Sequence, residues 1–236
     1  MLNEADTCRK FVVPKLQAAG WDDDPHSIAE QRTITDGRIV PVGKGFVRKP
    51  PKRVDYLLRF TRDFPLGVVE AKDAYKHAAD GLQQAKQYAE MLGLTFAYAT
   101  NGLEIIEFDY STGLEQPRHD YPTPAELWER YQVAAGLKKP EADRLLTPAN
   151  HAVDKGERYY QQIAINRTVE AVLKGDRRIL LTMATGTGKT AVAFQICWKL
   201  WNAGWNRLGE HRKPKILYLA DRNILVDQPK DGLFAA

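Results

Sequence analysis

Apolar residues in the first half of the chain recur at strand and helix spacings in turn. Residues 3–19 place apolar side chains at helical spacing before Gly20, which predicts a first helix. Every second residue from Val54 to Phe60 is apolar, which predicts a strand with one buried and one mostly polar face. Further along, the pattern predicts a strand at 66–72, a helix at 77–92, short strands at 95–99 and 104–108, and a helix at 124–135.

A different pattern begins beyond residue 156. Residues 137–156 have no clear periodicity and contain prolines, which is typical of a linker. After them, predicted helices at 157–174 and 189–203 alternate with apolar segments at 179–183 and 215–219, which we expect to be strands of a parallel sheet. We therefore expect an α/β chain made of a first domain at 1–136, a linker at 137–156 and an incomplete second domain at 157–236.

Composition and charge refine this picture. Hydrophobic residues make up 44% of the chain, enough for a folded core, and no segment approaches the about 18 apolar residues of a membrane span. Two distant cysteines, Cys8 and Cys197, cannot build a disulfide framework, which predicts a reducing, cytoplasmic location. Residues 1–150 carry a net charge of −2 and residues 151–236 a net charge of +6, which suggests two units with different tasks.

A glycine-rich segment follows the apolar residues at 179–183. Residues 184–190 read Ala-Thr-Gly-Thr-Gly-Lys-Thr and lead directly into a predicted helix. In such a loop several N–H groups face phosphate oxygens, and the helix N-terminus adds partial positive charge. We expect Lys189 to reach the β- and γ-phosphates of ATP and Thr190 to place its hydroxyl on Mg²⁺. The rest of the expected phosphate site is Thr185, Gly186, Thr187 and Gly188.

The segments around this loop resemble motifs of superfamily 2 helicases. Residues 158–162, Arg-Tyr-Tyr-Gln-Gln, resemble the motif that reads adenine, which implies that Gln161 pairs with the base. Residues 218–222 resemble the next helicase motif, whose arginine would meet a DNA phosphate. ATP hydrolysis also needs an acidic residue to hold the metal and place the attacking water. Because no acidic pair follows on a later strand, we expect this chain alone to lack ATPase activity.

A second group of charged residues lies in the first half of the chain. Asp55 lies on one predicted strand, and Glu70 and Lys72 lie two residues apart on the next, so that both point to one face. If the strands pair as a hairpin, two carboxylates and one ammonium converge. Two hard oxygen ligands suit Mg²⁺, and the ammonium can orient a water or stabilise developing negative charge. This is the arrangement that hydrolysis of a phosphodiester needs.

The spacing resembles the nuclease family named for its Asp…Glu-x-Lys motif. Gln84 and Tyr88 follow on the predicted helix, four residues apart on one face. The same pair recurs in the branch of these nucleases that is fused to helicases, which implies that both residues shape the DNA side of the site. A glutamate of the first helix also joins that branch's metal site, and Glu4 is the candidate here. The alternative for an isolated Asp…Glu-x-Lys is a salt-bridged pair of strands.

Between Lys44 and Arg62, seven basic residues stand against the single acid Asp55. Such a run is commonly a solvated surface, but beside a phosphodiesterase site it favours contact with the DNA backbone. The basic residues are Lys44, Arg48, Lys49, Lys52, Arg53, Arg59 and Arg62.

Nuclease motif, linker, glutamine motif and phosphate loop follow each other in this chain in the order found in one family. The chain resembles the N-terminal part of the restriction, or motor, subunit of type I restriction-modification enzymes. The resemblance implies a mixed-sheet restriction-endonuclease-like domain followed by the start of a RecA-like motor. It also implies cleavage of double-stranded DNA with Mg²⁺, translocation driven by ATP, and assembly with modification and specificity subunits.

Two alternatives stay open. One is a different motor, either a nuclease-fused superfamily 2 helicase of DNA repair or a type III restriction subunit. The other belongs to a different class, a non-catalytic remnant that binds DNA or a partner protein.

Overall fold

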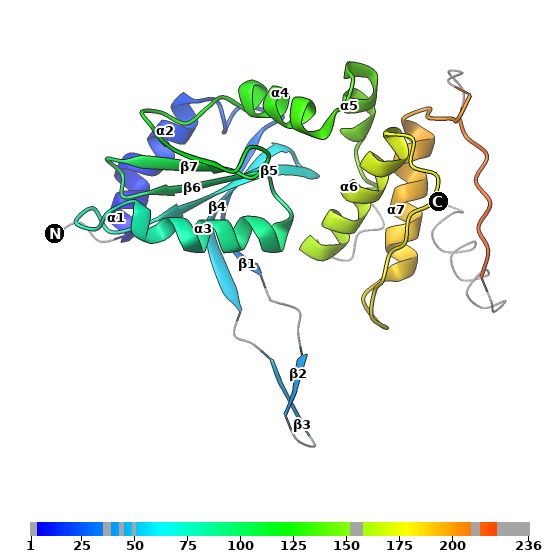
Figure 1. Ribbon diagram of the computed structural model, residues 1–236, viewed down its shortest axis with the longest axis horizontal. Coiled ribbons are helices and arrows are strands. Elements are labelled where there is room, and N and C mark those ends of the chain that lie inside the picture. Colours follow the sequence, from blue (N-terminus) through cyan, green and yellow to red (C-terminus); the bar gives the residue numbers. More distant parts are fainter. Residues whose placement is uncertain are drawn as a thin grey trace. The chain divides into compact units, whose positions relative to one another are not determined.

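The chain divides into two compact units, Met1–Ala134 and Ala135–Ala236, in a computed structural model (Figure 1). It describes residues 4–34, 39–42, 45–48, 51–151, 158–208 and 213–220. Lys44, Lys49 and Arg222, which the sequence analysis singled out, lie outside the described residues, and the side chains of Glu4 and Arg48 are not described.

The predicted first helix is present, but it consists of three consecutive segments. They are α1 (Glu4–Thr7), the π-helical turn η1 (Cys8–Val12) and α2 (Val13–Ala18). Pro14, near the start of α2, has no N–H to donate, so the regular α-helical hydrogen bonding cannot run through this point. Gly20 ends the helical region with a φ of 88°, as a glycine after a helix commonly does.

The first unit is built around a mixed six-stranded sheet in the order β1-β4-β5-β6-β7-β8, in which only β5 and β6 are parallel. The mixed α/β class is therefore confirmed. The strands are β1 (Ser27–Ile34), β4 (Lys52–Thr61), β5 (Phe64–Ala71), β6 (Phe96–Thr100), β7 (Ile105–Asp109) and β8 (Leu114–Arg118). Between β1 and β4 the chain forms a separate two-stranded sheet of β2 (Ile39–Val42) and β3 (Gly45–Arg48).

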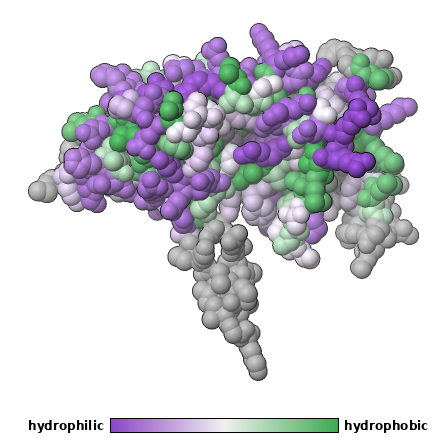
Figure 2. Space-filling view, viewed as in Figure 1, coloured by the Kyte–Doolittle hydropathy of each residue, from purple (hydrophilic) through white to green (hydrophobic). Residues whose placement is uncertain are grey.

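Helices cover both faces of this sheet. The crossover helix α3 (Ala79–Leu92) packs on β5 and β6, and α2 and α4 (Pro124–Ala135) lie on the opposite side (Figure 1). The predicted apolar stripe of α3, including Leu82, Ala85 and Ala89, is buried. On the face of this unit seen in Figure 2, hydrophilic residues predominate and apolar ones are scattered. The sheet and its helices therefore enclose the apolar core of this unit.

The residues on the predicted polar face of β4 are buried rather than exposed. Asp55 and Arg59 are 6% and 9% exposed, and Leu57 is also buried on that face. The reason is that a helix covers this side of the sheet: α3 packs there and brings Gln84 and Tyr88 close to Lys72 and Asp55. Strand β1 was not predicted, because its residues show no alternation of buried and exposed positions.

The second unit contains three described helices, α5 (Lys139–Leu145), α6 (Tyr159–Leu173) and α7 (Lys189–Asn202), with α5 packed on α6 and α6 on α7. The expectation of an unstructured linker is wrong for α5. Pro140 lies in its first turn, where a missing N–H costs little, and Ala142 and Leu145 are fully buried.

The expected strands at 179–183 and 215–219 are not formed. A strand needs a neighbour for its backbone N–H and C=O groups, and the described part of this unit offers only helices. Their apolar side chains are correspondingly exposed, with Leu180 at 90% and Leu217 at 81%. No described helix is long and apolar enough to cross a bilayer.

Candidate functional site

Strands β4 and β5 bring the two predicted carboxylates together. Tyr56 pairs with Val69 across this antiparallel ladder, so Asp55 and Glu70 stand opposite each other on the same face. Both are buried, at 6% and 3% exposure. The hairpin on which the expected convergence of charges depends is therefore present.

Hydrogen bonds from two different strands fix the Asp55 carboxylate. The backbone N–H of Ala71, at the end of β5, donates to Oδ2 over 2.9 Å. The side-chain amide of Gln31, on β1, donates to Oδ1 over 3.1 Å. Each oxygen thus has one donor and keeps lone-pair capacity for another ligand. Asp55 is held in one orientation without being saturated by these bonds.

Lys72 links Glu70 to the predicted Gln84 and Tyr88 pair. Its Nζ lies 3.0 Å from Oε1 of Glu70 and donates to Oε1 of Gln84 over 2.9 Å. The amide of Gln84 in turn donates to the hydroxyl of Tyr88 over 2.8 Å. The sequence predicted that Gln84 and Tyr88 share one helix face, and in the structure this face lies against Lys72 through Gln84.

Gly81, in the first turn of α3, makes room for Lys72. A methyl group at this position would lie 3.2 Å from both Cγ and Cε of Lys72. That separation is shorter than ordinary van der Waals contact between carbon atoms. The lysine stem therefore runs directly over the glycine, and any larger side chain would displace it.

The electrostatics of this cluster suit a divalent cation. Two carboxylates and one ammonium leave an excess of one negative charge beside buried apolar surface. Burial, with the charges of Glu70 and Asp55, raises the pKa of Tyr88, so the phenol stays protonated at neutral pH. Within the described residues no group of three or more His, Cys, Asp or Glu could hold a metal.

The basic segment contributes unequally to this region. Lys52 donates to the Gln87 amide oxygen over 3.2 Å, and its ammonium lies 5.9 Å from the centre of the Tyr88 ring. Arg53 and Arg62 are exposed. Arg59 is 9% exposed, so little of its side chain is available to a DNA backbone.

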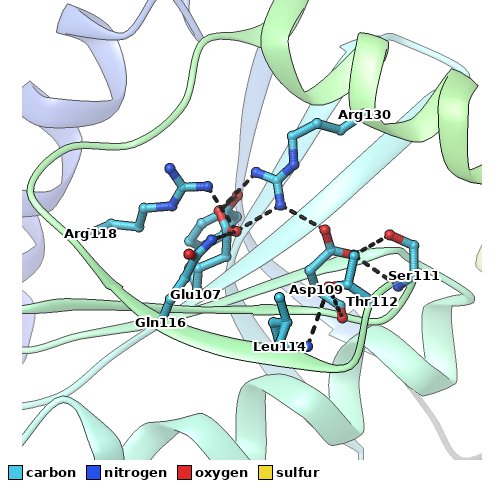
Figure 3. Close-up of polar contacts among 9 residues, drawn as sticks. Glu107, Asp109, Ser111, Thr112, Leu114, Gln116, Arg118 and Arg130 are labelled. Carbon is cyan, nitrogen blue, oxygen red and sulfur yellow. Dashed lines mark hydrogen bonds and ion pairs between the residues drawn. The ribbon is translucent and has the colours of Figure 1, made fainter.

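A second buried ionic cluster, on the opposite face of the sheet, was not predicted (Figure 3). Glu107 is fully buried and accepts hydrogen bonds from Tyr98, Gln116, Arg118 and Arg130. Burial alone would raise the pKa of this carboxyl, but the bonds from Arg130, Arg118 and Tyr98 lower it to about 2. Because β7 and α4 are joined by these ion pairs, we interpret the cluster as structural.

The glycine-rich loop of the second unit leads into α7. Gly186 and Gly188 have φ angles of 78° and 85°, conformations that favour glycine, and α7 begins at Lys189. The Lys189 ammonium donates to the carbonyls of Met183 and Ala184 over 3.4 and 3.2 Å. Thr190 lies in the first turn of the helix, next to these groups in sequence. The loop thus has curled backbone, lysine and helix start in the order that phosphate binding needs.

Gln161 lies against this loop. Its side-chain amide donates to the carbonyl of Thr187 over 2.7 Å, from the first turn of α6. Thr187 also donates from its hydroxyl to the carbonyl of Ala184 over 2.6 Å. The structure therefore joins the predicted adenine-reading residue to the predicted phosphate loop. Thr185 and Gly186, at the tip, are exposed.

Three comparisons place these features among known proteins. The chain is 40% identical to the Type I restriction enzyme EcoAI endonuclease subunit of Escherichia coli, over 99% of its length. It is 41% identical to the EcoKI endonuclease subunit of E. coli strain K12, over 96% of its length. A solved fragment of a putative HsdR subunit of a type I restriction enzyme from Vibrio vulnificus YJ016 is 57% identical, with a TM-score of 0.83 over 91% of this chain.

The chain belongs to the family of type I restriction endonuclease (HsdR) subunits. It spans 29% and 23% of the length of the two curated relatives and 41% of the solved chain. Residues 154–234 also match the family described as "Type III restriction enzyme, res subunit". Since that match covers only the second unit and the type I relatives align with nearly the whole chain, the type I family describes it better.

Two residues that contact the carboxylate cluster were missed by the sequence analysis. They are Gln31 and Gly81. Gln31 lies on the unpredicted strand β1, so no spacing pointed to it. Lys52 was among the seven basic residues expected to face DNA, but its place beside Tyr88 was not predicted. A glycine inside a predicted helix was the one available signal, because it weakens a helix unless close packing requires it.

Proposed function

We propose that this chain carries the Mg²⁺-dependent DNA nuclease site and the ATP-binding phosphate loop of a type I restriction endonuclease subunit. The observation that carries the nuclease assignment is the hydrogen-bonded chain of Glu70, Lys72, Gln84 and Tyr88, with Asp55 opposite Glu70 across the β4–β5 ladder. A simple salt bridge between two strands does not require Gln84 on the lysine and Tyr88 on that glutamine. The substrate is double-stranded DNA, and the reaction is phosphodiester hydrolysis.

Asp55 and Glu70 would hold Mg²⁺, with Glu4 as a further candidate ligand. The ion supplies Lewis acidity toward the phosphodiester and lowers the pKa of bound water. Lys72, held between Glu70 and Gln84, orients the attacking water or stabilises the negative charge that develops on the phosphate. Tyr88 remains a neutral hydrogen-bond donor on the DNA side, beside the ammonium of Lys52. Gln84 holds Lys72 in place because its side-chain oxygen accepts a hydrogen bond from the ammonium.

The second unit would bind ATP as the start of a RecA-like motor. Lys189, which bonds to two loop carbonyls here, would bind the β- and γ-phosphates, and Thr190 would bind Mg²⁺. The loop N–H groups from Thr185 to Gly188 would bind phosphate oxygens, and Gln161 would pair with adenine from its position beside Thr187.

The partners proposed for the complete subunit are DNA and the modification and specificity subunits of a type I complex. Sequence recognition belongs to the specificity subunit in this family, so the nuclease site needs only to read the DNA backbone. Charges such as Lys52 and Arg53, which lie outside the core, suit that role.

The test uses the full-length subunit assembled with its partner subunits. Asp55→Asn, Glu70→Gln and Lys72→Ala are expected to abolish DNA cleavage while ATP-driven translocation continues. Lys76→Ala serves as the control, since Lys76 is an exposed lysine of the following loop paired with Asp73. Cleavage at the wild-type rate in all three site variants would remove the nuclease assignment.

A further inference from the structure

Gln31 has an unusual backbone conformation in the middle of β1. Among the described residues it is the one non-glycine residue with a positive φ, of 50°. Its neighbours Glu30 and Arg32 pair regularly with Tyr56 and Val54 of β4. A left-handed residue within a strand costs on the order of 1–3 kcal/mol, and such strain persists where the surrounding structure enforces it.

The strained residue is the one that holds Asp55. Between the regular pairs Glu30–Tyr56 and Arg32–Val54, the residues left facing each other are Gln31 and Asp55. The Gln31 amide donates to Oδ1 over 3.1 Å, opposite the Ala71 N–H that donates to Oδ2 over 2.9 Å. One donor is backbone and fixed by the sheet, whereas the other depends on the Gln31 side chain alone.

We propose that Gln31 is a positioning residue of the nuclease site, whose left-handed backbone aims its amide at Asp55 and sets the direction of that carboxylate toward the metal. This inference rests on the proposed function, in which Asp55 binds Mg²⁺. An amide suits the task because it donates a hydrogen bond without adding charge beside a cation site. Groups that orient a metal ligand typically change metal affinity 10- to 100-fold when they are removed.

A purely structural role predicts a different outcome for the same substitution. Glycine adopts a φ of 50° without strain, so Gln31→Gly keeps the backbone of β1 and removes only the amide. If the Gln31 side chain served the fold alone, this variant would change the free energy of unfolding and would bind metal as tightly as the wild type. Glu30→Gly is the matched control, because it makes the same substitution at the adjacent position, whose side chain points to the opposite face.

The experiment measures Mn²⁺ binding to the full-length subunit by calorimetry without DNA or nucleotide, and the Mg²⁺ concentration for half-maximal cleavage in the assembled enzyme. Gln31→Gly is expected to weaken Mn²⁺ binding and raise that Mg²⁺ concentration by about tenfold, with urea unfolding and translocation unchanged. Glu30→Gly should leave both metal readouts at wild-type values. In an Asp55→Ala background, Gln31→Gly should have no further effect on Mn²⁺ binding.

The outcomes separate this inference from the function on which it rests. If Asp55→Ala abolishes cleavage but Gln31→Gly leaves Mn²⁺ affinity and Mg²⁺ dependence unchanged, the positioning role is wrong and the nuclease assignment stands. An equal loss of affinity from Gln31→Gly with and without Asp55 would also overturn it, because Gln31 would then act independently of Asp55. If Asp55→Ala neither impairs cleavage nor weakens Mn²⁺ binding, the proposed function itself fails.

Discussion

Replacing Glu107 with glutamine tests how the sheet and α4 are held together. Glu107 is fully buried and accepts bonds from two arginines, of which Arg130 also bonds to Asp109. Glu107→Gln preserves the shape of the side chain but removes its charge and presents an NH₂ group to guanidinium donors. Two half-buried arginines then lose the anion that they share.

The size of the effect follows from the pKa of the carboxyl, which the fold lowers from 4.5 to about 2. One pH unit corresponds to 1.36 kcal/mol, so the ionised carboxylate stabilises the fold by roughly 3 kcal/mol at pH 7. That value agrees with the about 3–5 kcal/mol lost when one partner of a buried ion pair is removed. We therefore expect Glu107→Gln to reduce the free energy of unfolding by about 3 kcal/mol at pH 7.

The pH dependence gives a second check. Because the folded-state pKa is depressed, the stabilisation is fully present above about pH 4.5 and is lost as the pH falls toward 2. Wild type and Glu107→Gln should therefore differ in urea unfolding at pH 7, and the difference should shrink below about pH 4.5 and be largely lost near pH 2. Glu115→Gln, on neighbouring β8, is the control, because Glu115 is half exposed and its pair with Lys86 contributes little. Equal stability of Glu107→Gln and wild type at pH 7 would refute this reasoning.

Three further variants test other contacts. Gly81→Ala should lower DNA cleavage about tenfold because the added methyl group displaces Lys72. The free energy of unfolding in urea should be unchanged or higher, since alanine favours a helix by roughly 0.5–1 kcal/mol. Cleavage at the wild-type rate would contradict the packing of Lys72 on Gly81. Lys189→Ala should abolish ATP binding, translocation and hence cleavage, and normal translocation would count against the loop. Gln161→Ala should weaken ATP binding more than GTP binding in equilibrium titrations, whereas equal losses would point to the Thr187 contact alone.

The sequence predicted the elements whose side chains alternate or repeat clearly. Val54, Tyr56 and Leu58 gave strand β4, and the helix α4 was predicted with its observed ends, Pro124 and Ala135. The pairing of β4 with β5, which the sequence analysis left as a condition, places Asp55 opposite Glu70. Strong periodicity in these segments arises because one face is buried in the core.

What the sequence missed depends on contacts between distant segments. Strand β1 has little apolar alternation and is held by pairing with β4, so neither it nor Gln31 could be placed. The edge strand β8 contains Pro117, which argues against a strand except at a sheet edge. The sequence did not show that Arg59 is buried, because the exposure of a strand residue depends on the segments that pack around it. A local sequence pattern does not show which distant segment packs against it.

The central claim is that Asp55, Glu70 and Lys72 carry out DNA cleavage and take no part in translocation. The most direct measurement compares cleavage and translocation by the assembled enzyme carrying Lys72→Ala in the full-length subunit. The account predicts that cleavage falls by at least about 100-fold, the contribution typical of one preorganised electrostatic group, while the translocation rate stays at its wild-type value. Cleavage at the wild-type rate, or parallel loss of cleavage and translocation with the protein still folded, would contradict it.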